Sequence, residues 1–236
     1  MTFTSLAGDI LDELLERHPV TATILGDHRF DDRLEDHSEP ALDEEASWVG
    51  RRLADLRSVD GGALAVAEQV DLDLLTNALE RRRFELEELR EHEWNPLVVN
   101  PGTAVYTLLA RDFAPLGDRL RSAAGRLAAV PGSLETARRS HDGMPRVHLE
   151  TALVQFTGTR TLLATQLERA LAEEPSMRRE VEPVRDRAVE ALEEHLDWLR
   201  GQLDTADRDP RLGAAAFSRK LALTLDTSID ADALLA

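Results

Sequence analysis

The side chains best suited to chemistry in this sequence are its seven histidines, because imidazole binds metals and transfers protons near neutral pH. A helical zinc-peptidase motif, His-Glu-x-x-His, places two imidazoles on one helix face with a glutamate as base. His92 alone is followed by glutamate, and Pro96 stands where the second histidine belongs. No histidine has a glutamate three residues before it, as di-iron bundles require. The sequence therefore predicts no catalytic residue and no metal site in this chain.

Two looser groups of polar residues remain. One flanks a Gly-Met-Pro turn and consists of His141, Asp142, His148 and Glu150. We interpret it as helix-end capping and solvated charge, with a metal site as the less favoured alternative, because residues two apart face different sides of a helix. The other group, Glu190, Glu194 and His195, is interpreted as a solvent-exposed helix face.

Nucleophile and phosphate-binding motifs are also missing. The sequence has no cysteine and no Gly-x-Ser-x-Gly turn, and its only lysine, Lys220, belongs to no phosphate-binding loop. A dinucleotide fingerprint would need a preceding strand and three spaced glycines. We find no complete active site, so whether the chain is part of an enzyme is left open, and no cofactor is expected in it.

The chain is acidic, with 28 Lys and Arg against 45 Asp and Glu and a net charge of −17. Such a chain is repelled by phosphate backbones, so non-specific nucleic-acid binding is excluded as a function. The first residues carry acids where a signal peptide needs positive charge, and no apolar run approaches the roughly 18 residues of a membrane span. We therefore expect a cytoplasmic protein without a membrane partner.

Apolar residues recur at helical spacing along most of the chain, as in Phe3, Leu6 and Ile10. Proline and glycine separate the expected helices, which cover about residues 3–17, 40–57, 63–93, 103–113, 116–130, 133–141, 146–172, 177–204 and 213–225. No segment alternates like a strand. The predicted fold is an all-α multi-helix bundle with long antiparallel helices and no significant sheet, forming one helical domain over residues 1–236.

Two segments carry further information. The apolar loop 95–102, NPLVVNPG, is bracketed by two Asn-Pro pairs and is expected to pack against other residues. Near the C-terminus, Asp230 has the character of an N-cap, with Ile229 and Leu234 placed as a hydrophobic staple. A helix opening six residues before the last one favours a chain that is the N-terminal part of a longer protein.

Several motifs resemble the N-terminal half of the bacterial family called domain of unknown function 885. They are GDHRFDDRLEDHS at 26–38, NPLVVNPGTAVYTLLARDFAPLGDRL at 95–120, PRVHLETALVQFTG at 145–158 and RLGAAAFSRKLALTLDTSIDADALL at 211–235. The C-terminal half of that family looks like a helical zinc metallopeptidase of the carboxypeptidase and oligopeptidase type. The resemblance implies that zinc belongs to that half and that this chain forms one wall of a substrate cleft.

Within this resemblance, the candidates for facing the cleft and a peptide substrate are Tyr106, Arg111 and His148. Tyr106 and Arg111 lie too far apart around a helix to share one face, so at most one of them is expected to point inward. The alternative for each is ordinary packing or a surface ion pair.

Three functions stay open. The favoured one is the cleft-forming half of a zinc metallopeptidase-like protein, with an apolar face covered by the missing C-terminal half or by a second subunit. The second is a free-standing helical interaction or scaffold protein without catalysis. The third is a helical bundle that binds a small molecule.

Overall fold

The computed structural model describes residues 2–226, and every regular element in that range is a helix. The predicted all-α class is confirmed. The described residues form two compact units, one from residues within 1–13, 38–91 and 210–236, the other from 14–37 and 92–209. Each is treated by itself below. The predicted staple at Ile229, Asp230 and Leu234 lies outside the described residues.

The first unit contains the start of α1 (Phe3–Arg17), α3 (Glu39–Arg57), α4 (Val66–Phe84) and α10 (Ala214–Leu225). Ser38 stands at the N-cap position of α3, and its side chain makes no capping hydrogen bond. The apolar residues of α3 at helical spacing are buried: Leu42, Trp48, Val49, Leu53 and Leu56. Glu45 is also buried, and both of its carboxylate oxygens accept hydrogen bonds from Arg82 at 2.8 and 2.6 Å. This bidentate pair joins α3 to α4.

One face of α4 carries exposed apolar side chains among the residues that the structure describes. Val66, Val70 and Leu74 follow one another at four-residue steps, and their exposed fractions are 78%, 52% and 53%. Residues at this spacing form a stripe on a helix. An exposed apolar stripe of this kind is typical of a surface that meets a partner.

The helix predicted over 63–93 is wrong in its second half. After α4 the chain takes a π-helical turn at Glu85–Leu89 and a left-handed residue, Arg90, before the short α5 (Glu91–Trp94). A π turn adds a residue to one helical turn and so shifts the faces that follow. Leu86 and Leu89 are both buried in this arrangement, which offsets the lost regularity.

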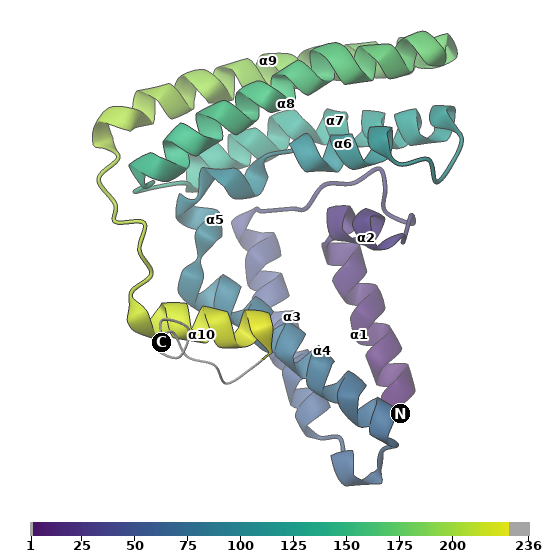
Figure 1. Ribbon diagram of the computed structural model, residues 1–236, viewed down its shortest axis with the longest axis vertical. Coiled ribbons are helices and arrows are strands. Elements are labelled where there is room, and N and C mark those ends of the chain that lie inside the picture. The colour runs from purple at the N-terminus through teal and green to yellow at the C-terminus, as the bar shows by residue number, and fades with distance from the viewer. Residues whose placement is uncertain (1, 227–236) are drawn as a thin grey trace. The chain divides into compact units, whose positions relative to one another are not determined.

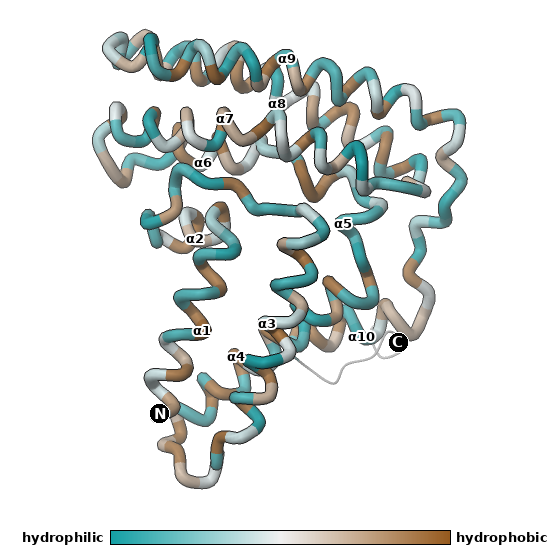
Figure 2. Tube along the Cα trace, turned by 180° about the vertical axis from the view of Figure 1, so that it is seen from behind, coloured by the Kyte–Doolittle hydropathy of each residue, from teal (hydrophilic) through white to brown (hydrophobic). Residues whose placement is uncertain are grey.

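The second unit is built on three long helices, α7 (Leu116–Ser140), α8 (Arg146–Glu173) and α9 (Arg178–Gln202). Consecutive members of this set run antiparallel, as predicted (Figure 1). Hydrophobic and hydrophilic residues alternate along them (Figure 2). The apolar faces meet in one core that includes Leu127, Leu134, Leu149, Phe156 and Leu192. The shorter α2 (Pro19–Leu25) and α6 (Gly102–Ala110) complete the unit.

Helix α7 corrects the prediction of two helices separated at Pro131. Proline lacks the N–H that would bond to the carbonyl of Leu127, so it weakens a helix interior. Here the helix continues through it. The residues on either side, Leu127, Val130 and Leu134, are all buried at helical spacing, and their packing outweighs the lost hydrogen bond.

Candidate functional site

The segment between the two Asn-Pro pairs is ordered by the asparagines themselves. Asn95 Oδ1 accepts a hydrogen bond from the Leu97 N–H at 3.1 Å, and Asn100 Oδ1 accepts one from the Gly102 N–H at 2.9 Å. These turns, made by asparagine side chains, flank the 3-10 helix Pro96–Val99. Pro96 and Val99 are buried, so the prediction that this apolar loop packs against other residues is confirmed.

Asn100 also holds the start of α6 against α8. Its Oδ1 accepts a second hydrogen bond, from Thr159 Oγ1 at 2.7 Å. A Cβ atom on Gly102 would lie only 2.5 Å from that same Thr159 Oγ1. Only glycine therefore allows this approach of the two helices without a shift.

Two hollows open on either side of this contact. The first has a volume of about 300 Å³ and is lined by Val20, Leu34, Glu35, His37, Val98, Val99, Asn100, Pro101, Thr103, Ala104 and Ser133. The second has a volume of about 370 Å³ and is lined by Leu97, Asn100, Gly102, Thr103, Tyr106, Gln155, Gly158, Thr159 and Leu162. Asn100 and Thr103 line both hollows, so together they form the divide between them.

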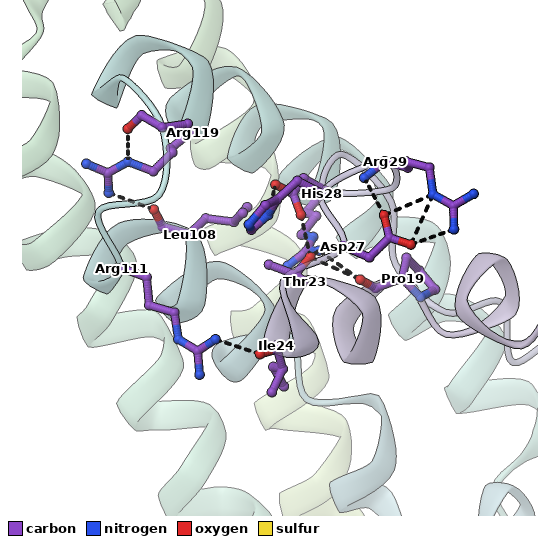
Figure 3. Close-up of polar contacts among 12 residues, drawn as sticks. Pro19, Thr23, Ile24, Asp27, His28, Arg29, Leu108, Arg111 and Arg119 are labelled. Carbon is purple, nitrogen blue, oxygen red and sulfur yellow. Dashed lines mark hydrogen bonds and ion pairs between the residues drawn. The ribbon is translucent and has the colours of Figure 1, made fainter. Parts of the chain in front are cut away.

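The structure separates the sequence-predicted cleft residues. Tyr106 is 47% exposed and lines the larger hollow beside Gln155. Arg111, just after α6, instead donates from Nη1 to the Ile24 carbonyl at 2.7 Å and ties α6 to α2 (Figure 3).

His148 lies near the start of α8, where its ring meets the ring of Trp94 edge-on at 5.3 Å. It stands seven residues, about two helical turns, before Gln155, which places it on the same face of α8. His148 is half-buried and does not line either hollow.

A buried arginine supports α6 from behind. Arg126 on α7 is fully buried and donates to the Ala104 carbonyl and to Thr23 Oγ1, both at 2.6 Å. Burial lowers the pKa of its guanidinium below the usual value. Thr23 lies 2.5 Å from Asp31 Oδ1, so the guanidinium, the hydroxyl and a buried carboxylate form one chain.

The loop 26–38 is fastened to this chain of polar groups. His28 Nδ1 lies 3.0 Å from Asp31 Oδ2, and its ring stacks on Phe113 with centroids 3.8 Å apart. Gly26, left-handed with a φ of 94°, ends α2 and turns the chain into this loop. Figure 3 shows His28 beside α2 and the end of α6. The loop therefore positions the wall of the smaller hollow.

Comparison with known proteins places the chain in a family. The family model described as "Bacterial protein of unknown function (DUF885)" matches residues 19–236. The chain belongs to the DUF885 family. No curated protein matches it. A solved structure of "a putative lipoprotein of unknown function" from Shewanella oneidensis is similar, with 24% identity and a TM-score of 0.91. The match covers 99% of this chain and 44% of that one, so this chain spans less than half the length of its structural neighbour.

The histidines of this DUF885 chain are not gathered into a metal site. Within residues 2–226, no group of three or more His, Asp and Glu side chains could hold a metal ion. His141 caps α7, and its ring nitrogens face the carbonyls of Ala137 and Asn95 at 2.7 and 3.1 Å. In the same range no helix is long and apolar enough to span a bilayer.

His195 corrects the interpretation of a solvent-exposed face on α9. Glu190 and Glu194 are exposed or partly exposed, but His195 is fully buried between Phe156 and Trp198, at centroid distances of 4.8 and 5.3 Å. Neither ring nitrogen has a hydrogen-bond partner. Burial, with a smaller contribution from the nearby Arg138 charge, lowers its pKa from 6.5 to about 3.

Sequence reasoning missed the residues that make the larger hollow in this DUF885 protein. Asn100, Gln155 and Thr159 are uncharged, and their types alone predict no chemistry. The repeated Asn-Pro pair was the available signal, since asparagine before proline favours a side-chain turn. Which helix meets that turn depends on a contact between residues 59 apart, Asn100 and Thr159.

Proposed function

We propose that this chain forms the non-catalytic helical wall of the substrate cleft in a longer zinc metallopeptidase-like protein. The observation that carries the proposal is the pair of adjacent hollows beside Tyr106, in a chain that corresponds to 44% of a longer structure with the same fold. The motif resemblance supplies the type of protein. Zinc and the general base would come from residues that this chain does not contain.

In this proposal Tyr106 and His148 face the cleft, and a peptide is the substrate. Tyr106 on α6 lines the larger hollow, and His148 lies on the face of α8 that carries the lining residue Gln155. Arg111 contributes by holding α2 against α6 through the Ile24 carbonyl. The distinction matters for a test. Substitution of a residue that faces the cleft changes KM or kcat, whereas substitution of a residue that only fixes one helix to another changes the stability of the fold.

The experiment compares the longer protein with residues 1–236 of this chain. We expect the longer protein to contain about one zinc by elemental mass spectrometry and to cleave members of a peptide library, with cleavage abolished by a chelator. The 236-residue chain should bind no stoichiometric zinc and cleave nothing. Stoichiometric zinc in this chain, or a longer protein with neither zinc nor cleavage, would overturn the proposal.

A matched pair of variants tests the cleft assignment in the longer protein. Gly158 lines the larger hollow, and a Cβ atom on it would meet nothing within 4 Å, so Gly158→Leu fills the hollow without disturbing packing. Gly201→Leu makes the same change at an open position near the end of α9. We expect KM to rise at least tenfold for the first variant only, and equal kinetics for the two would contradict the assignment.

A free-standing interaction protein is the second candidate, and the exposed stripe Val66, Val70 and Leu74 favours it. Under the first proposal this stripe is covered by the rest of the longer protein or by a second subunit. Under the second it binds a separate partner. The variant Val70→Glu distinguishes the two proposals. If the stripe is buried inside the longer protein, the variant reduces that protein's solubility and zinc content. If the stripe is a free surface, the variant leaves solubility and zinc content unchanged.

A further inference from the structure

The amide of Asn100 has a fixed orientation. Its Oδ1 accepts from the Gly102 N–H and from Thr159 Oγ1, so the oxygen is identified by its two donors and the Nδ2 group must occupy the other side of the amide. Among the described residues, Nδ2 has no hydrogen-bond partner. A side chain with its acceptor fully engaged and both donor hydrogens open is suited to bind a carbonyl oxygen.

Asn100 also lies between the two hollows, so a ligand that occupies both would pass over it. It lines the smaller hollow and the larger hollow, and among the described residues Thr103 alone does the same. Their volumes, about 300 and 370 Å³, lie at the small end of the roughly 300–1,000 Å³ of ordinary ligand pockets. A ligand that fills both must therefore be extended across Asn100.

None of the described residues that line the larger hollow is charged. Its polar groups are amides and hydroxyls, those of Asn100, Thr103, Tyr106, Gln155 and Thr159, and its apolar residues are Leu97 and Leu162. A ligand carboxylate or ammonium would find no opposite charge among these residues. Uncharged amide groups and apolar side chains fit this lining. The smaller hollow differs, since Glu35 and His37 lie along it.

We infer that Asn100 donates a hydrogen bond from Nδ2 to a backbone carbonyl of an extended polypeptide, whose uncharged interior segment lies in the larger hollow. This inference rests on the proposed function and specifies it. The hollow receives a segment inside the peptide rather than its charged C-terminus. Asn100 binds and positions the ligand and takes part in no bond-breaking step.

The test uses residues 1–236 and uncharged probes, N-acetylated and C-amidated hexapeptides of Ala, Leu, Gly and Ser. Nuclear magnetic resonance follows the Asn100 side-chain NH₂ signals, assigned by their loss in Asn100→Asp. We expect saturable shifts of these signals, and Asn100→Asp should weaken binding at least tenfold. The aspartate keeps both accepted hydrogen bonds, so the turn is preserved while the donors are replaced by a repelling carboxylate. Thermal unfolding of each variant checks the fold.

Gly158→Leu should also weaken binding at least tenfold, with Gly201→Leu unchanged. The inference is overturned if the peptides do not shift the Asn100 signals at 10 mM, if Asn100→Asp binds them equally well, or if chitohexaose saturates the hollow and the peptides do not. Peptide binding here without zinc in the longer protein would reject only the proposed function. Zinc-dependent cleavage by the longer protein with an unchanged KM in Asn100→Asp would reject only this inference.

Discussion

The burial of His195 predicts a loss of stability in mild acid. In the folded chain its pKa is about 3, whereas the unfolded chain takes up the proton near 6.5. Between these values the unfolded state binds more protons than the folded one, so the free energy of unfolding falls as the pH falls. The stability is fully present above about pH 6.5.

The size of the effect follows from the distance between the experimental pH and the unfolded pKa. Each pH unit below 6.5 removes about 1.4 kcal/mol, so at pH 5.0 the single group removes about 2 kcal/mol of unfolding free energy. The carboxylates also titrate in this pH range, but their effect cancels when the wild type is compared with a variant at position 195 that contains the same carboxylates. Urea denaturation at pH 7.5 and pH 5.0, followed by circular dichroism, measures the loss directly.

His195→Leu isolates the histidine. Leucine has a similar volume and no polar atoms, so we expect unfolding free energy at pH 7.5 to rise by about 1 kcal/mol, because two unpartnered ring nitrogens are removed from the core. The acid-induced loss should be about 2 kcal/mol smaller than in the wild type. Glu194→Gln, an exposed change beside it on α9, should leave that loss unchanged. Losses within about 0.5 kcal/mol of each other in wild type and His195→Leu would refute the reasoning.

The remaining predictions concern the contacts that hold loop 26–38 against α2 and α7. Gly125→Ala should lower the free energy of unfolding by about 1–3 kcal/mol, because the new Cβ would lie 2.6 Å from the Asp32 carbonyl oxygen. Gly132→Ala is the control in the same helix, because its new Cβ would meet nothing within 4 Å, and it should raise the free energy of unfolding by up to about 1 kcal/mol. Equal changes for the two variants in urea denaturation would contradict the close approach of Gly125 to Asp32. Thr23→Val keeps the side-chain shape but removes the hydroxyl that accepts from Arg126, and should cost about 2 kcal/mol, whereas a cost under about 0.5 kcal/mol would show that this bond does not hold the loop.

Much of the helical layout was predictable because local patterns and tertiary packing agree. The inward stripe of α3, from Leu42 to Leu56, follows helical periodicity and is buried as expected. Gly26 takes the left-handed conformation that a glycine after a helix favours. At Pro131 the local signal and the packing disagree, and the packing decides.

The candidate site was less predictable, since its features arise between helices. Tyr106 was found because it is the only tyrosine and follows a marked loop. His195 was misplaced because its sequence neighbours are acidic, while its surroundings are set by Phe156 on another helix. The role of Asn100 depends on Thr159, which nothing in the local sequence connects to it.

The contact between Arg126 and Thr23 joins residues 103 positions apart and so governs the order of events during protein synthesis. A ribosome that adds about 5–20 residues per second delivers Arg126 roughly 5–20 s after Thr23. Until then the Thr23 hydroxyl and the Asp31 carboxylate have only each other and their near neighbours Pro19 and His28 as partners. The intervening residues 38–91 belong to the other unit and are synthesised earlier. The packing of α2 and the loop after it against α7 can therefore be completed only after Arg126 has been synthesised.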